Sequence, residues 1–105
     1  MQLITATKID CLVLDNGEGW LTIFWLDNDH SKRSLTIDFD GFCQREMPIR
    51  SGLGVELIAC QRDRVHLRFT DQLATNLQLA TDVCFAAELP KRDYENLLAF
   101  AECLP

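Results

Sequence analysis

The sequence is poor in the features that mark membrane-spanning and secreted proteins. Its longest unbroken apolar runs are four or five residues, whereas a membrane-spanning helix needs about 20. The first basic residue is Lys8, so the amino terminus lacks the charged start and apolar run of a secretion signal. We therefore expect a cytoplasmic protein that does not bind a membrane.

Basic residues are also scarce. Ten Lys and Arg residues face sixteen Asp and Glu residues, which gives a formal net charge of −6. A negative surface repels phosphate, so nucleic-acid binding is not expected and a basic protein partner is favoured. The hydrophobic fraction of 48% and charged fraction of 25% are typical of globular proteins. A chain of 105 residues has room for one core, and we expect a single domain over residues 1–105.

The cysteines are too far apart in the sequence to form a recognisable motif. They are Cys11, Cys43, Cys60, Cys84 and Cys103. Their number is odd and no C-x-x-C pair occurs, so neither a disulfide framework nor a zinc or redox motif is expected. Free cysteines are commonly buried as small apolar side chains. Cys43, which lies in a polar segment, is the expected exception.

Histidines are equally sparse. His30 falls in an expected turn and His66 in an expected strand, and neither has a second histidine or a cysteine two to four positions away. Zinc ligands commonly come in pairs at such spacings. We therefore expect no metal site, no catalytic residues and no cofactor, in a protein that is not an enzyme. A Cys–His pair formed in space, such as Cys60 or Cys43 with His66, is the enzymatic alternative that stays open.

Alternating apolar residues predict three strands in the first forty residues, over Leu3–Leu14, Trp20–Asp27 and Ser34–Asp40. Polar turns separate them. If both hairpins close in their shortest registers, nine apolar side chains share one face in three cross-strand rows. These rows are Val13, Leu21 and Phe39; Cys11, Ile23 and Ile37; and Ile9, Trp25 and Leu35. We expect this face to form the core.

The opposite face of the same strands is a candidate partner-binding site. It carries apolar side chains bordered by acids: Leu12, Trp20, Phe24 and Leu26 beside Asp10, Asp38 and Asp40. Aromatic residues next to charges are common at protein interfaces. The alternative is that another segment of the chain covers these apolar residues.

The segment Gly41–Gly54 shows no sustained period and predicts a long loop. A loop of this length is often functional, although a crossover between two halves of a sheet explains it equally well. Within it, Phe42, Met47 and Ile49 are expected to dock on the core.

A third hairpin is predicted from Val55–Gln61 and Arg64–Phe69, joined by a two-residue turn. Its outer face carries a basic stripe of Arg64, His66 and Arg68, with Arg62 at the turn. Such a stripe could receive an acidic partner or a phosphate. The alternative is a solvated face whose arginines pair with Glu56, Asp63 or Asp71.

The remaining residues predict one more strand and two helices. Thr70–Gln72 is typical of a helix start, and Asp82–Leu89 alternates as a strand. The tail Lys91–Leu104 places one apolar stripe at helical spacing, formed by Tyr94, Leu97, Leu98, Ala101 and Leu104. The expected fold is therefore α+β, with a mostly antiparallel sheet of about six strands packed by a carboxy-terminal helix.

Four runs in the second half carry a resemblance: GVELIACQRDRVHLRF, DQLATNLQ, DVCFAAEL and KRDYENLLAFAECL. They resemble the carboxy-terminal half of the immunity-protein-ten family, small bacterial proteins associated with polymorphic toxin systems. The residues that would hold the family's structural positions are Gly54, Arg62, Asp63, Tyr94, Leu97 and Leu98. The resemblance implies a non-enzymatic cytoplasmic protein that neutralises a cognate toxin domain.

In that interpretation a basic toxin domain is the partner. The acids Asp10, Asp38 and Asp40 would face its cationic active-site cleft, while Trp20 and Phe24 anchor the contact. The alternative function is a structural or regulatory module that self-associates, as a homodimer, through a strand edge or the same apolar face.

Overall fold

The computed structural model describes residues 1–46 and 49–103, which form an α+β fold built on one eight-stranded sheet. The strands are β1 (Gln2–Val13), β2 (Gly19–Leu26), β3 (Lys32–Asp38), β4 (Cys43–Glu46), β5 (Arg50–Gly52), β6 (Val55–Gln61), β7 (Arg64–Phe69) and β8 (Asp82–Ala86). The helices are α1 (Asp71–Leu77) and α2 (Lys91–Cys103). The spatial order is β5-β4-β3-β2-β1-β8-β7-β6, and β1 with β8 is the one parallel pair among these strands. The predicted fold class is confirmed, but the strand count is eight and not six.

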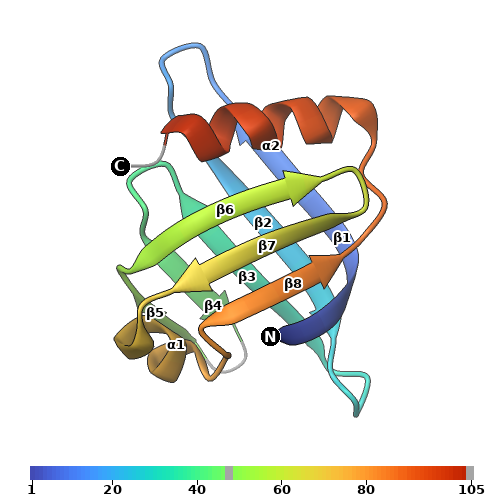
Figure 1. Cartoon of the computed structure of the whole chain (residues 1–105), viewed down its shortest axis with the longest axis vertical. Helices are drawn as coiled ribbons and strands as arrows, with labels where there is room; N and C mark the ends of the chain where they lie inside the picture. The colour runs from blue at the N-terminus through green and yellow to red at the C-terminus, as the bar shows by residue number, and fades with distance from the viewer. Residues whose placement is uncertain (47–48, 104–105) are drawn as a thin grey trace.

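Strand β1 belongs to both halves of the sheet. Its residues 2–5 pair in parallel with β8, and its residues 6–13 pair antiparallel with β2. A register shift between Ala6 and Lys8 marks a bulge, and bulges bend the strand that contains them. Consequently β6, β7 and β8 form a layer that crosses in front of the layer of β1–β4 (Figure 1).

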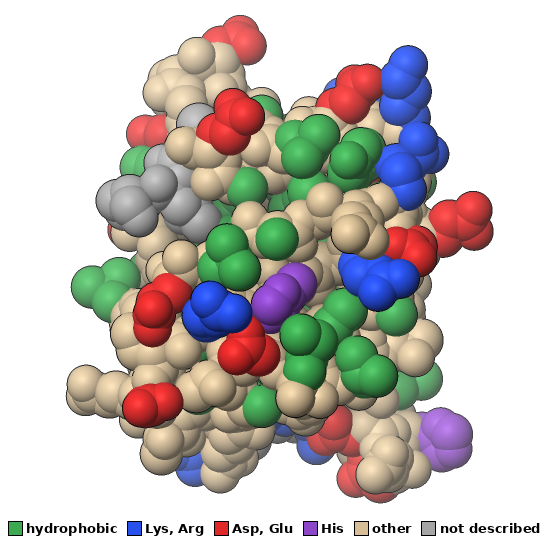
Figure 2. Space-filling model, in the orientation of Figure 1, with side chains coloured by type: hydrophobic (Ala, Val, Ile, Leu, Met, Phe, Trp, Pro, Cys, Tyr) green, Lys and Arg blue, Asp and Glu red, His purple; other side chains and the backbone are tan. Residues whose placement is uncertain are grey.

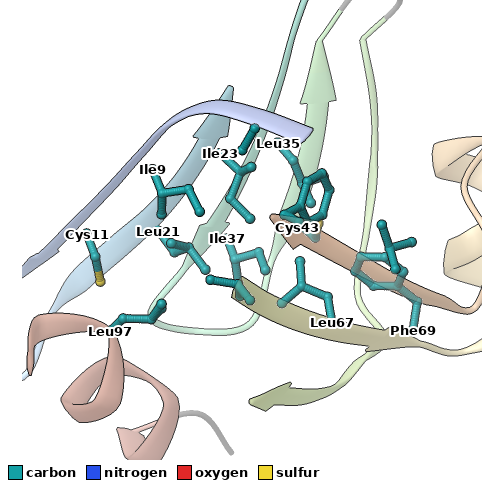
Figure 3. Packing of buried hydrophobic residues seen from close by; sticks show 14 of the residues in the cluster. Ile9, Cys11, Leu21, Ile23, Leu35, Ile37, Cys43, Leu67, Phe69 and Leu97 are labelled. Atoms are coloured by element: carbon teal, nitrogen blue, oxygen red, sulfur yellow. The ribbon is translucent and has the colours of Figure 1, made fainter. Parts of the chain in front are cut away.

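The core lies between these two layers. Figure 3 shows Ile23 and Ile37 of one layer pointing toward Leu67 of the other. Trp25 contacts Phe85 across the layers, with ring centroids 5.3 Å apart. Leu97 of α2 is fully buried and closes one end of the core, beside β1 and β6. Among the described residues no helix is long and apolar enough to cross a bilayer.

The predicted registers of the first two hairpins are wrong by two residues. Leu21 pairs with Cys11 and Ile37, not with Val13 and Phe39. In both hairpins the turn is centred one residue earlier than predicted, since Val13 pairs with Gly19 and Leu26 pairs with Lys32. A shift of two residues leaves every side chain on its predicted face, so the predicted core face is otherwise correct.

Phe39 is the exception to that core face. Strand β3 ends at Asp38, where a turn begins in which the N–H of Gly41 donates to the Asp38 carbonyl at 2.9 Å. Phe39 lies in this turn and is 43% exposed. Asp40 also lies in the turn, and its Oδ1 accepts from the N–H of Phe42.

The predicted loop Gly41–Gly54 contains two strands, β4 and β5. Strands of three or four residues are too short to show an alternating pattern, which is why the sequence did not predict them. Cys43 of β4 pairs with Ile37 and is fully buried, so its predicted exposure is wrong. Phe42 and Ile49 are exposed and do not dock on the core. Met47 lies outside the described residues.

The third hairpin, formed by β6 and β7, has the predicted register. Its cross-strand pairs include Ile58 with Leu67, Cys60 with Val65, Ala59 with His66 and Leu57 with Arg68. The predicted helix start is also confirmed, since the Thr70 hydroxyl accepts from the N–H of Leu73 at 3.2 Å. Strand β8 ends at Ala86, short of the predicted Leu89, but Val83, Phe85 and Leu89 are buried as expected.

The buried stripe of α2 differs from the predicted one. Leu97 and Phe100 are buried, whereas Leu98 is 41% exposed. The prediction missed Phe100 and wrongly buried Leu98, because two candidate stripes overlap on this helix and only the packing against β1 and β6 selects one. Leu104 lies outside the described residues.

Candidate protein-binding site

The outer side of the β1–β4 layer carries a group of exposed apolar side chains, here called the aromatic face. Its members are each 36% to 45% exposed and are Leu12, Trp20, Phe24, Leu26 and Phe42. No described segment covers them, so the alternative of a covering segment is wrong for this part of the chain. Several exposed large apolar side chains on one side of a sheet are typical of interaction sites.

Cross-strand pairing brings three members of the aromatic face, Leu12, Trp20 and Phe42, into one outer row. Leu12 stands opposite Trp20, and Trp20 stands opposite Asp38. Phe42 continues this row, because the Asp38 N–H donates to the Phe42 carbonyl at 2.9 Å and the next residue, Cys43, pairs with Ile37 on the inner side. Asp38 is therefore flanked by two aromatic rings on one outer row.

Phe42 is a surface residue that the sequence reasoning placed in the core. The signal that could have found it is its neighbour: a buried residue at position 43 requires the side chain at 42 to point outward in a strand. That inference needed β4 to be recognised first.

The three predicted acids differ in their surroundings. Asp10 lies opposite Thr22 on the outer side and forms an ion pair with Lys8 at 3.4 Å. Asp38 and Asp40 form no ion pair with any described residue. Two carboxylates thus remain available beside the row of Trp20 and Phe42.

The basic stripe lies on the other layer and is largely neutralised. Arg64 pairs with Asp63 at 3.1 Å. His66 and Arg68 both contact Oδ1 of Asp82, at 2.8 and 2.9 Å. The alternative of a solvated, self-paired face is therefore supported, with Asp82 as a partner that the sequence reasoning did not name. Figure 2 shows acidic and basic side chains interspersed on this side of the molecule.

The predicted binding residues do not form one site. Trp20, Phe24, Asp10 and Asp38 share the outer side of β1–β3, with Asp40 at its edge. The basic stripe belongs to β7, whose outer side faces the viewer in Figure 1, while the aromatic face points away from the viewer. The two surfaces are on opposite sides of the molecule.

The two Cys–His pairings considered from the sequence, Cys43 or Cys60 with His66, find no support in the geometry. Cys43 is buried in the core, where burial raises the pKa of its thiol to about 12. Cys60 pairs with Val65 on the inner side of the hairpin, whereas His66 points outward and its Nε2 is hydrogen-bonded to Asp82. The described residues also contain no group of three or more His, Cys, Asp or Glu side chains arranged to hold a metal ion.

Arg45 is a second residue whose position the sequence did not indicate. It was expected in a loop, but it lies on β4 and is only 8% exposed. Its Nη1 donates to the Leu77 carbonyl at the end of α1, at 2.7 Å. Its guanidinium lies over the Trp25 ring, 5.6 Å from the ring centroid. No local sequence pattern could reveal this contact, because 32 residues separate Arg45 from Leu77.

Comparisons of the chain with models of protein families, with curated proteins and with solved structures find no match.

Proposed function

We propose that this chain is a non-enzymatic protein-binding domain that docks a basic protein partner on the aromatic face. The observation that carries the proposal is the outer row Leu12–Trp20–Asp38, extended by Phe42. It combines exposed aromatic rings with a carboxylate that has no ion-pair partner among the described residues. Aromatic side chains supply most of the affinity at many interfaces, and charges at the border accelerate encounter.

The charge of the chain supports a basic partner. The net charge is −6, and Asp38 and Asp40 lie next to the exposed rings. A partner with a cationic cleft would be steered to this side of the molecule and would neutralise both carboxylates on contact.

The resemblance of the second half to the immunity-protein-ten family suggests the identity of such a partner. In this proposal the partner is a toxin domain in the bacterial cytoplasm, and the aromatic face covers its active site. Free thiols such as Cys60 and Cys84 fit a reducing compartment.

The experiment begins with a pull-down by the tagged protein from a lysate of the native host, followed by kinetics with the recovered partner. Trp20→Ala should weaken binding by at least about 2 kcal/mol, roughly 30-fold in Kd, mainly through faster dissociation. Asp38→Asn should slow association and reduce its dependence on salt.

The matched control for Trp20→Ala is Leu57→Ala, since Leu57 is similarly exposed at 37% but lies on β6. The control should bind like the wild type. Equal losses in Trp20→Ala and Leu57→Ala, or wild-type binding by both Trp20→Ala and Asp38→Asn, would rule out this interface.

Self-association through the same face is the competing function, and light scattering of the purified protein distinguishes it. A homodimer that Trp20→Ala converts to a monomer would assign the aromatic face to a second copy of the chain. A monomer would support binding of a different protein at the aromatic face.

A further inference from the structure

A cavity of about 770 Å³ opens at the end of the molecule opposite α2. The start of β1 and the β2–β3 turn both lie at this end (Figure 1). Its lining includes Gln2, Thr5, Trp25, Asp29, Arg45 and Leu79. Pockets that hold small molecules typically measure about 300 to 1,000 Å³ and often lie at the mouths of barrel-like sheets. The cavity is therefore large enough for a small ligand.

Arg45 supplies a buried positive charge to this cavity. Its Nη1 is engaged by the carbonyls of Leu77 and Gln78, at 2.7 and 3.4 Å. Its Nε is buried without a hydrogen-bond partner, and no described residue accepts from its Nη2. Burial lowers the pKa of the guanidinium, but arginine remains charged at neutral pH.

The free side of this guanidinium has the geometry that a carboxylate recognises. Two parallel N–H groups on one edge of arginine form a bidentate pair with the two oxygens of a carboxylate. Since Nη1 is occupied, the edge that remains is the one formed by Nε and Nη2. A buried donor without an acceptor is unfavourable, so a bound carboxylate would remove that cost.

The β2–β3 turn contributes negative charge at the rim of the same cavity. Asp27 is already engaged, with its Oδ2 2.7 Å from Arg33 Nε and its Oδ1 accepting from the Trp25 indole. Asp29 is exposed, and hydrogen bonds from Ser31 lower its pKa, so it is ionised at neutral pH. A phosphate with two negative charges would be repelled by this rim, whereas a ligand with an ammonium group would be attracted.

We propose that this cavity binds a free amino acid or a short peptide, with the ligand carboxylate on Arg45 and its ammonium group toward Asp29. The inference is independent of the aromatic face, because Leu26 is the one residue of that face that lines the cavity. A free amino acid and a short peptide both present a carboxylate and an ammonium group, and they differ in the length of the chain between these two groups.

The test is an NMR titration that follows the Trp25 indole N–H in the full-length protein. The probes are the twenty free L-amino acids, glycine-containing dipeptides, the carboxamide of each compound, and inorganic phosphate. We expect saturable shifts with at least one amino acid or dipeptide and binding at least tenfold weaker for its carboxamide. Preference for single amino acids or for dipeptides then identifies the class.

Two variants connect the binding to the proposed contacts. Asp29→Asn changes an exposed turn residue and should weaken the best ligand at least threefold, whereas Asp15→Asn, in the β1–β2 turn outside the cavity, should bind like the wild type. Arg45→Lys should weaken it at least tenfold, because lysine lacks the planar fork. No shift with any probe, equal binding of acid and carboxamide, tighter binding of phosphate, or wild-type affinity in Asp29→Asn would overturn the proposal.

Discussion

Asp82 organises the outer side of β7 through a single oxygen atom. Its Oδ1 contacts both His66 and Arg68, at 2.8 and 2.9 Å. Hydrogen bonds from His66 and then from Arg68 lower the pKa of this carboxyl. One carboxylate therefore holds two neighbouring side chains of the basic stripe in place on the outer side of β7.

Replacing Asp82 should change how stability depends on pH. Its carboxyl has a lower pKa in the folded than in the unfolded protein, where the value is about 3.9. The carboxylate therefore stabilises the fold above that pH, and this contribution is lost as the pH falls through the folded-state value. In Asp82→Asn the difference between urea midpoints at pH 7 and pH 2.5 should be smaller than in the wild type.

Asp15→Asn is the control for this measurement, because Asp15 is exposed and forms no ion pair with a described residue. It should retain the wild-type difference between the two midpoints. A wild-type difference in Asp82→Asn as well would show that the contacts of Asp82 with His66 and Arg68 contribute nothing to the fold.

At the scale of elements, α2 shows how packing selects one side of a helix. Leu97 and Phe100 face β1 and β6 and are buried, while Leu98, adjacent in sequence to Leu97, remains exposed. Asn96 donates to the Cys11 carbonyl on β1 at 3.2 Å, which further orients the helix. The sequence of α2 therefore predicts only in part which of its residues pack against the sheet.

Phe100→Ala and Leu98→Ala should separate the two sides of α2. Removing the buried Phe100 ring should cost about 3 to 5 kcal/mol of unfolding free energy, because it leaves a cavity. Leu98→Ala removes a partly exposed side chain and should cost less than about 1 kcal/mol. Urea denaturation of the three proteins measures both values, and similar costs for the two variants would contradict the observed orientation of α2.

Gly54 connects the two layers just before β6, and its neighbours explain the glycine. Its φ of +134° is a conformation that other residues rarely adopt, and an added Cβ would collide with the Thr70 hydroxyl. Its carbonyl accepts from the Thr70 N–H at 2.8 Å. The connection between β5 and β6 is thereby joined to the start of α1.

At the scale of the whole molecule, the two layers depend on each other. They share β1, and each layer covers the inner side of the other, so neither has a core of its own. We therefore expect one cooperative unfolding transition. The molecule should unfold as a single unit although its sheet has two differently oriented halves.

Two probes can test this cooperativity in one urea titration. Trp25 lies between the layers against Phe85, and in Trp20→Phe its indole becomes the one tryptophan that reports by fluorescence. Far-UV circular dichroism reports on the sheet and helices together. The two midpoints should coincide, and a fluorescence midpoint clearly separated from the dichroism midpoint would show that the layers unfold independently.

Longer strands and hairpins with short turns were predicted more accurately than short strands and hairpins with longer loops. The two-residue turn at Arg62 and Asp63 left one natural register, and the β6–β7 pairing was predicted correctly. The longer loops of the first two hairpins allowed several registers, and the predicted one was wrong by two residues. Strands β4 and β5 were missed because a few residues contain no measurable period.

The residues of the candidate surfaces were also predictable only where a local sequence pattern specified their position. Alternation along β2 was sufficient to place Trp20 and Phe24 on the outer side and Trp25 on the inner side. Phe42 and Arg45 required β4, and the cavity around Arg45 required the end of α1 as well. No local pattern in β4 or in α1 indicates that these two elements lie next to each other.

The sequence by itself determined which residues form most strands and helices and which side of each strand is apolar, since these properties depend on near neighbours and on a fixed period. The tertiary structure decided which sides meet. The bulge in β1 and its parallel pairing with β8 join residues about eighty positions apart and fold the sheet into two layers. That pairing places the aromatic face and the basic stripe on opposite sides of the molecule. The sequence alone could not determine this arrangement, because local periodicity specifies the orientation of a side chain but not its distant neighbours.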